Sequence, residues 1–308
     1  MRAAVYYDLL PQTGFRNDGN PCYVTQSLKR RGIECDILAP NETIKHFGKY
    51  DLNIVVDWGE DALRSIIPYE VKYPTPYIYW ASDTHINNGK EGDSYPYRLE
   101  TARKAAIVFC AQKRAIEEFR RDGVHAEWLP HAFEPWAYHD IESGKPVPFN
   151  YASKDYDVSF VGHVNSDNRI DFLDRMFKEF PNFFWGQRRF QDAAKIYCKS
   201  KISLNISMTD DVNMRNYEIA GSGGCLLTNW LPTIEELGFE DGKTCLLYKS
   251  LEEASDKTNY YLKHDSEREK IAQTGLELCL ERHTIDKRVD RMLEVAKNFV
   301  ENKEKVEA

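Results

Sequence analysis

Two side chains on one predicted helix have the types and spacing to bind a phosphorylated sugar. Arg215 and Glu218 stand three residues apart in the range 213–220, so they share a helix face. A guanidinium can neutralise a phosphate, and a carboxylate can accept hydrogen bonds from a pair of hydroxyls. The turn Gly221-x-Gly223-Gly224 follows, and its missing Cβ atoms would let a ligand approach the backbone. The alternative is an ion pair on a helix that ends in a glycine cap.

Polar residues also follow predicted strands in the N-terminal half. Asp83 and His85 come after the strand 77–80, and Asp57 comes after the strand 53–56. Ligands of open α/β sheets bind beyond the carboxyl ends of the strands, so Asp83 and His85 are candidates to hold or deprotonate a hydroxyl. Gly14 and Arg16, in the segment after the first strand, could approach a phosphate or a second substrate. An Asx turn at Asp83 is the structural alternative.

Strands and helices are predicted to alternate along the whole chain. The strands are expected at 3–7, 35–38, 53–56, 77–80, 107–110, 158–162, 183–185, 202–206, 225–228 and 245–248. The helices are expected at 21–31, 112–122, 168–179, 190–199, 213–220, 251–262 and 267–281. This alternation, with β-branched strand cores, predicts α/β structure with parallel sheets covered on both faces.

A stretch rich in helix breakers divides the chain. Residues 128–155 contain Pro130, Pro135, Gly144, Pro146 and Pro148 without a regular period, which indicates a linker. We therefore predict two Rossmann-like domains with parallel sheets facing across a cleft. The N-terminal domain would comprise residues 1–150 and the C-terminal domain residues 151–285. Residues 286–308 would form a final amphipathic helix followed by a charged end.

Composition limits the classes of partner. The 308-residue chain has a net charge of -8, so its overall field does not attract nucleic acid or an anionic membrane. No apolar run approaches the roughly 20 residues that span a bilayer, and the N-terminus lacks the features of a signal peptide. A local basic strip keeps a nucleic-acid partner possible. It consists of Arg98, Arg103, Lys104, Lys113, Arg114, Arg120 and Arg121.

Cysteine usage and missing motifs narrow the chemistry further. The seven cysteines are scattered, without a C-x-x-C pair, which argues against a disulfide framework or a zinc site. This pattern favours a reducing compartment, so we expect a cytoplasmic protein without a metal. Neither a G-x-G-x-x-G nor a P-loop sequence occurs, so a dinucleotide cofactor is not indicated.

Ordered motifs in residues 157–297 have the spacing of a known family. They are Asp157-Val158-Ser159-Phe160-Val161-Gly162, Leu204-Asn205, Arg215-x-x-Glu218, Gly221-x-Gly223-Gly224, Leu227-Thr228, Thr233-Ile234-Glu235-Glu236, Glu281-x-His283-Thr284 and Arg288. In these motifs the chain resembles the donor domain of the group 1 glycosyltransferases, in the branch that includes spore maturation protein B. The resemblance implies a GT-B fold, a nucleotide-sugar donor, no cofactor and no metal. It also implies that the last helix crosses back to the first domain.

The resemblance implies roles for individual residues. Glu218 would bind the ribose hydroxyls of the donor, and Asp210 stands where the family often has a first glutamate. Arg215 would stabilise the departing diphosphate. The lysine that often follows the first strand of this domain is not obvious here, and Arg169, or Arg188 and Arg189, could supply its charge. The expected donor-binding set is Gly162, Arg169, Asn205, Asp210, Arg215, Asn216, Glu218, Gly223, Gly224 and Thr228. The expected catalytic set is Asp83, His85 and Arg215, and the expected acceptor side is Gly14, Arg16, Asp57, Asp83 and His85.

The implied activity is transfer of a sugar from a nucleoside diphosphate, with UDP as the expected nucleotide, to an acceptor hydroxyl. We expect a hexosyltransferase that retains the anomeric configuration and needs no metal. The acceptor stays open between a glycan, a protein, a small molecule and a modified nucleic acid. One alternative is a nucleotide-sugar-binding GT-B protein without turnover. The other is a GT-B epimerase or phosphorylase, and the sequence shows no dedicated lysine for a phosphorylase pocket.

Overall fold

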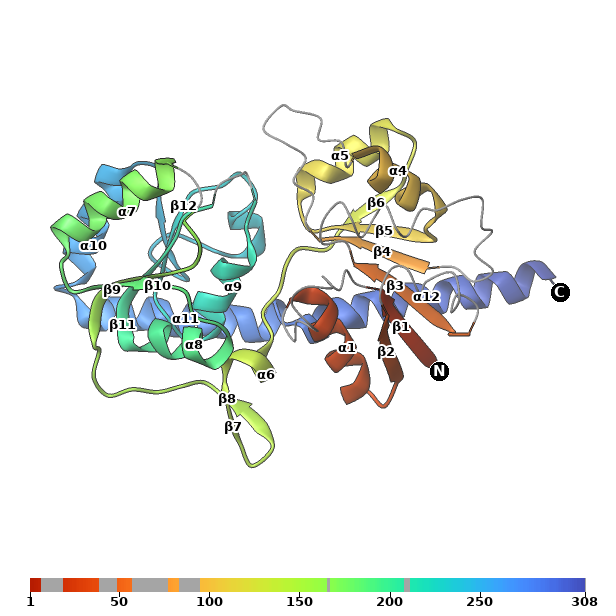
Figure 1. Ribbon diagram of the computed structural model, residues 1–308, viewed down its shortest axis with the longest axis horizontal. Helices are drawn as coiled ribbons and strands as arrows, with labels where there is room; N and C mark the ends of the chain where they lie inside the picture. The colour runs from red at the N-terminus through yellow and green to blue at the C-terminus, as the bar shows by residue number, and fades with distance from the viewer. Residues whose placement is uncertain are drawn as a thin grey trace. The chain divides into compact units, whose positions relative to one another are not determined.

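The chain forms two compact units, each built on a parallel sheet (Figure 1). A computed structural model describes residues 1–6, 19–38, 49–56, 77–82, 95–164, 167–207 and 211–307. The first unit comprises Met1–Pro130 together with Ile285–Ala308, and the second unit comprises His131–Thr284.

The sheet of the first unit is six-stranded and parallel, with the order β2-β1-β3-β4-β5-β6. Its strands are β1 (Arg2–Tyr6), β2 (Glu34–Leu38), β3 (Leu52–Val56), β4 (Tyr77–Ala81), β5 (Ile107–Cys110) and β6 (Ala126–Trp128). Its helices are α1 (Asn20–Arg30), α4 (Tyr95–Lys104), α5 (Lys113–Arg121) and α12 (Ile285–Glu307). Figure 1 shows α4 and α5 over one face of this sheet and α1 with α12 over the other.

Apolar residues explain why these elements form. All five residues of β3 and of β4 are buried, as expected for central strands of a sheet covered on both faces. In α5, Ala115, Ile116 and Phe119 lie on one face and pack into the core of the unit. In α12, Ile285, Val289 and Met292 are fully buried. The last helix of the chain therefore completes the core of the first unit.

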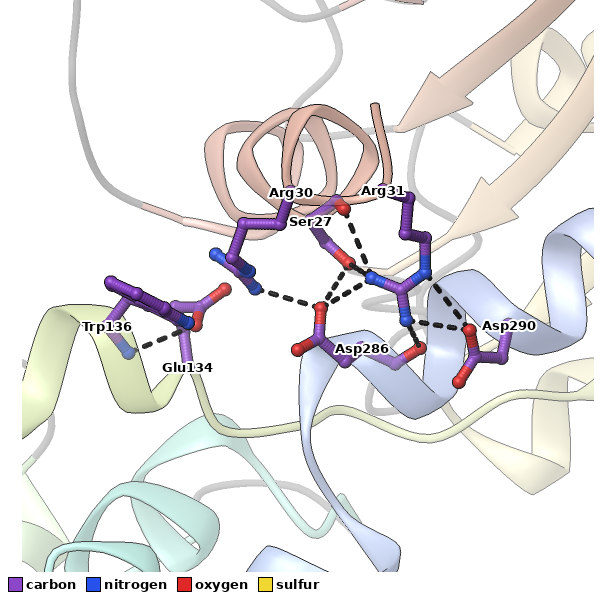
Figure 2. A network of polar contacts seen from close by, with 7 residues as sticks. All are labelled: Ser27, Arg30, Arg31, Glu134, Trp136, Asp286 and Asp290. Atoms are coloured by element: carbon purple, nitrogen blue, oxygen red, sulfur yellow. Dashed lines mark hydrogen bonds and ion pairs between the residues drawn. The ribbon is translucent and has the colours of Figure 1, made fainter. Parts of the chain in front are cut away.

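A polar network fixes α12 against α1 (Figure 2). The Asp286 carboxylate accepts hydrogen bonds from Ser27 Oγ at 2.5 Å, Arg30 Nη2 at 2.9 Å and Arg31 Nη1 at 2.7 Å. Arg31 also donates to Asp290 Oδ1 at 2.6 Å. Burial opposes ionisation of Asp286, but the donors around its carboxylate outweigh that effect and lower its pKa.

Replacing Asp286 with asparagine is expected to destabilise the first unit by about 1–2 kcal/mol at pH 7. The expected loss of stability is no larger than this because the Asp286 side chain is 38% exposed, so solvent screens its ion pairs. A lowered pKa gives stability that is present above the unfolded value of about 3.9 and is lost as pH falls through the folded value. The difference between Asp286→Asn and wild type should therefore shrink below about pH 4.

Urea unfolding at a series of pH values measures this difference. Asp256→Asn, at an exposed position in the second unit, is the matched control. Equal stability of wild type and Asp286→Asn at pH 7 would contradict the prediction.

The sheet of the second unit is five-stranded and parallel, with the order β10-β9-β11-β12-β13. Its strands are β9 (Tyr156–Val161), β10 (Phe183–Gly186), β11 (Ser200–Asn205), β12 (Leu226–Asn229) and β13 (Leu246–Tyr248). Its helices are α7 (Asp167–Glu179), α8 (Phe190–Lys199), α9 (Met214–Gly221), α10 (Leu251–Tyr261) and α11 (Asp265–Arg282), with the short 3₁₀ helix η2 (Glu235–Leu237). Figure 1 shows α7 and α10 over one face of the sheet and α8 and α9 over the other.

The order in which strands are added to the sheet reverses at β9. From β9 the chain passes through α7 to β10 on one side, and then through α8 to β11 on the other side of β9. Ligands of doubly wound sheets bind beyond the carboxyl ends of the strands at such a reversal. The ends of β9 and β11 are therefore the place to look for a site in the second unit.

The predicted fold class is confirmed, and every predicted strand is found within a few residues of its expected bounds. The predicted linker is more structured than expected. It contains α6 (Pro135–Tyr138) and the hairpin of β7 (Asp140–Glu142) and β8 (Lys145–Val147). Residues 131–150, which we assigned to the first domain, group with the second unit. Backbone pairing explains this, because the Phe133 N–H donates to the His283 carbonyl at 2.8 Å.

Two further properties concern the environment of the protein. All seven cysteines are buried, and none of them forms a disulfide. Among the described residues, no helix is both long enough and apolar enough to cross a membrane.

Candidate functional site

Several predicted residues meet at the carboxyl edge of the second sheet. Gly162 follows β9, Asn205 ends β11 and Thr228 lies near the end of β12. Arg215 is the second residue of α9, which begins at the same edge. The structure thus brings together, where the strand order reverses, residues that are far apart in the sequence.

The Arg215 guanidinium is held in place from several directions. The Asn213 side chain caps α9 by accepting a hydrogen bond from the Arg215 N–H at 3.1 Å. Arg215 Nη1 donates to Asn205 Oδ1 at 3.1 Å, and the guanidinium lies 4.9 Å from the centre of the Phe160 ring. A Cβ atom at position 162 would lie 2.2 Å from Arg215 Nη2. Only glycine at position 162 therefore leaves room for Arg215 in this position.

A second cation, which is more deeply buried, lies beside Arg215. Arg169, from α7, donates to the carbonyl oxygens of His163 at 2.9 Å and Ile206 at 2.5 Å. Its guanidinium is 5.8 Å from the same Phe160 ring. Burial, followed by the nearby charge of Arg215, lowers the pKa of Arg169 to about 10. Two like charges gathered at one edge of a sheet create a favourable place for an anion.

Asn205 is the centre of a buried hydrogen-bond network beneath Arg215. Its Nδ2 group donates to Ser207 Oγ at 3.2 Å, Asn216 Oδ1 at 3.2 Å and Thr228 Oγ1 at 3.1 Å. Asn205, Asn216 and Thr228 are all fully buried. In the structure these three residues support Arg215 from the interior. Direct contact between them and the donor stays a prediction.

Glu218 lies one helical turn after Arg215 and does not pair with it. The Tyr138 hydroxyl, from α6, donates to Glu218 Oε1 at 2.6 Å. Burial raises the pKa of Glu218, while the Tyr138 hydrogen bond and the charge of Arg215 oppose that rise. Within the described part of the chain, Arg215 and Glu218 form no ion pair with each other. The simple alternative of a surface ion pair on a helix is therefore wrong.

Gly223 and Gly224 lie at the other end of α9. The Gly223 N–H donates to the Ala220 carbonyl at 2.9 Å and the Gly224 N–H to the Ile219 carbonyl at 2.9 Å. Gly223 has a φ of 90°, which favours glycine in a turn. This turn precedes β12, so it lies at the amino edge of the sheet, away from Arg215. Donor contact by Gly223 and Gly224 therefore stays a prediction.

The remaining predicted site residues lie outside the described residues. They are Gly14, Arg16, Asp57, Asp83, His85 and Asp210. The acceptor-side assignments and the first acidic position of the donor site therefore stay predictions. Among the residues that the structure describes, no group of three or more His, Cys, Asp or Glu side chains is arranged to hold a metal ion.

Sequence reasoning missed the contribution of residues 131–139. In the second unit, His131 Nε2 lies 3.8 Å from Asp211 Oδ2, and the Tyr138 hydroxyl contacts Glu218. These residues fall in a segment without periodicity and with several prolines, which predicted only a linker. The sequence carries no signal that pairs Tyr138 with Glu218, because the two are 80 positions apart.

Comparison with solved structures identifies the architecture. HepE from Anabaena, in a complex with UDP and glucose, superposes with a TM-score of 0.68 at 11% sequence identity, over 97% of this chain and 100% of that chain. Sucrose-phosphate synthase from Thermosynechococcus elongatus superposes with a TM-score of 0.67 at 10% identity, over 98% and 99% of the two chains. The chain has the GT-B fold. TarM from S. aureus is a more distant GT-B neighbour, with a TM-score of 0.62 at 12% identity, over 83% of this chain and 57% of that chain.

The sequence comparison covers the unit that carries the candidate site. Residues 154–294 match the glycosyl transferase-like family, and this range contains Gly162, Arg169, Asn205, Arg215 and Glu218. No curated protein matches the chain. The family match therefore concerns this part of the chain, and the solved structures show the fold of the chain.

Proposed function

We propose that this protein is a glycosyltransferase that transfers a sugar from a nucleoside diphosphate to an acceptor hydroxyl. UDP is the nucleotide we propose, since UDP is bound in the HepE structures of the same fold. The observation that most strongly supports this proposal is that Arg215 and Glu218 lie on one face of α9 and do not pair with each other. A cation and a separate carboxylate acceptor are what a diphosphate and a ribose require.

The two charged groups have distinct proposed roles. Negative charge develops on the diphosphate as the glycosidic bond breaks, and Arg215, held in place before the ligand arrives, stabilises that charge. Arg169 adds a second positive charge nearby. Glu218 accepts hydrogen bonds from the ribose hydroxyls. Because guanidinium groups supply the positive charge, we propose that the transfer needs no divalent metal.

The stereochemistry and the acceptor are proposed from the sequence. The resemblance to group 1 glycosyltransferases favours retention of configuration, through a front-face transfer in an ion-pair-like state. On the acceptor side we propose Asp83 and His85, together with Gly14 and Arg16, which follow β1 in the sequence, and Asp57, which follows β3. The acceptor class stays open between glycans, proteins, small molecules and modified nucleic acids.

Replacing Glu218 with glutamine is expected to weaken UDP binding by about 10- to 100-fold. A hydrogen bond to a charged group contributes roughly 1.5–3 kcal/mol, and each 1.4 kcal/mol is tenfold in affinity. Titration calorimetry with UDP measures the change. Glu277→Gln, at an exposed position of α11 in the same unit, is the matched control. Unchanged UDP affinity in Glu218→Gln would rule out the ribose assignment.

Turnover requires a separate measurement. A thermal-shift screen over nucleotide sugars identifies the donor, because a ligand at 100 times its dissociation constant stabilises the folded protein by about 2.7 kcal/mol. UDP release is then followed with a panel of acceptors. Tight donor binding without product on any acceptor would favour the binding protein without turnover.

A further inference from the structure

Residues 133–139 form a strap over α9 within the second unit. The Phe133 ring lies directly on the backbone of Gly221, where a Cβ atom would come within 2.6 Å of Phe133 Cγ. His139 Nε2 lies 2.8 Å from the Gly221 carbonyl oxygen, and His139 is almost fully buried. The strap is therefore packed rigidly against the end of the helix that carries Glu218.

The strap places one hydroxyl at the Glu218 carboxylate. Tyr138 is 6% exposed, and its ring lies 6.0 Å from the Phe133 ring. Phe133, whose ring lies near the Tyr138 ring, and His139, the next residue in the chain, both contact Gly221. The phenol of Tyr138 therefore has little freedom to move. Its hydroxyl donates to Glu218 Oε1 at 2.6 Å, which is the short distance typical of a hydrogen bond to a charged acceptor.

We propose that Tyr138 is a positioning residue that makes the site select a ribonucleotide over a 2′-deoxyribonucleotide. This inference rests on the proposed function of Glu218 as the acceptor for the ribose hydroxyls. Tyr138 donates to Oε1 and so restricts the orientation of the carboxylate, whose two oxygens have further lone pairs that can accept hydrogen bonds. A carboxylate fixed in this way can meet two adjacent hydroxyls at once, as a 2′,3′-diol presents them.

The hydrogen bond also offsets a cost of burial. Burial disfavours the ionised form of Glu218, and a donor aimed at the carboxylate favours it. Without the Tyr138 hydroxyl, the carboxylate would lose both its orientation and part of this compensation. The effect should fall on the hydroxyl contacts and not on the remainder of the nucleotide, since Arg215 is held by Asn205 and Phe160.

Titration calorimetry with UDP and with 2′-deoxy-UDP tests this proposal. Wild type should bind UDP more tightly than 2′-deoxy-UDP. Tyr138→Phe should weaken UDP binding by about tenfold and should weaken binding of 2′-deoxy-UDP, which keeps only the 3′-hydroxyl contact with Glu218, by a smaller factor, so the selectivity falls. In a Glu218→Gln background, adding Tyr138→Phe should cause no further loss, because the two residues act through one contact.

A matched control exists in the first unit. Tyr50 donates to Asp36 Oδ2 at 2.7 Å, so Tyr50→Phe removes the same kind of hydrogen bond away from the proposed site. Melting temperatures confirm that each variant is folded. Equal weakening of both nucleotides, unchanged selectivity or fully additive losses in the double variant would each overturn the role of Tyr138. Absence of UDP binding by wild type would instead overturn the proposed function, and this inference with it.

Discussion

Replacing Arg215 with alanine is expected to lower the rate of sugar transfer by about 100- to 1000-fold. Removing one preorganised group that stabilises transition-state charge costs this much in other enzymes. Arg215 meets the condition of preorganisation, because Asn205, Phe160 and the space above Gly162 hold its guanidinium before a ligand binds. The loss should fall mainly on kcat, since the charge on the diphosphate increases as the bond to the sugar breaks.

Two variants sharpen this experiment. Arg175→Ala removes an exposed arginine of α7 that pairs with Glu252, and it should leave transfer unchanged. Gly162→Ala keeps the charge of Arg215 but adds a methyl group at its Nη2 atom, so it should also slow transfer. Transfer should continue in EDTA. A wild-type kcat in Arg215→Ala would refute the proposal that Arg215 stabilises the charge on the departing diphosphate. Activity that vanishes with EDTA and returns with manganese would refute it as well.

Replacing His85 with alanine is expected to lower turnover by about 10²- to 10⁴-fold, the usual contribution of general base catalysis. β4 ends at Ala81 between β3 and β5, and Asp83 and His85 follow it in the sequence. Ligands of open α/β sheets bind beyond the carboxyl ends of the strands. His85 would position or deprotonate the acceptor hydroxyl, and Asp83 would orient the imidazole or bind the acceptor.

The measurement pairs transfer rate with UDP affinity. His85→Ala and Asp83→Asn should change the rate but barely change UDP affinity, because the donor residues belong to the second unit. His125→Ala, at an exposed position next to β6 in the first unit, is the control for loss of a histidine. Wild-type rates in both Asp83→Asn and His85→Ala would reduce this segment to a structural turn.

The periodicity of apolar residues predicted the fold because it reflects which side chains are buried. Short apolar runs between amphipathic stretches identified all the strands of the second sheet, since parallel strands covered on both faces contain few polar residues. The same signal missed α4 and α6. The α4 sequence YPYRLETARK has a weak apolar face, and α6 has only four residues, so neither produces a clear helical pattern.

Motifs predicted the edge of the site but not the contacts within it. The spacing of Arg215 and Glu218 correctly placed them on one helix face. It could not show that their partners would be Asn205 and Tyr138, because these contacts depend on how α9 packs against β11 and the strap. Gly223 and Gly224 show why a motif alone does not assign a contact. A glycine-rich turn satisfies helix carbonyls as readily as it admits a ligand, and the sequence does not distinguish the two uses.

The division of the chain into units bears on how the protein folds during synthesis. The second unit is one continuous stretch, His131–Thr284, whereas the first unit needs both Met1–Pro130 and the helix that begins at Ile285. A nascent chain that has emerged as far as residue 284 contains all of the second unit. The first unit still lacks the buried side chains of Ile285, Val289 and Met292 at that point. The unit that is translated first is therefore completed last, and its uncovered apolar surface is available to chaperones until α12 emerges.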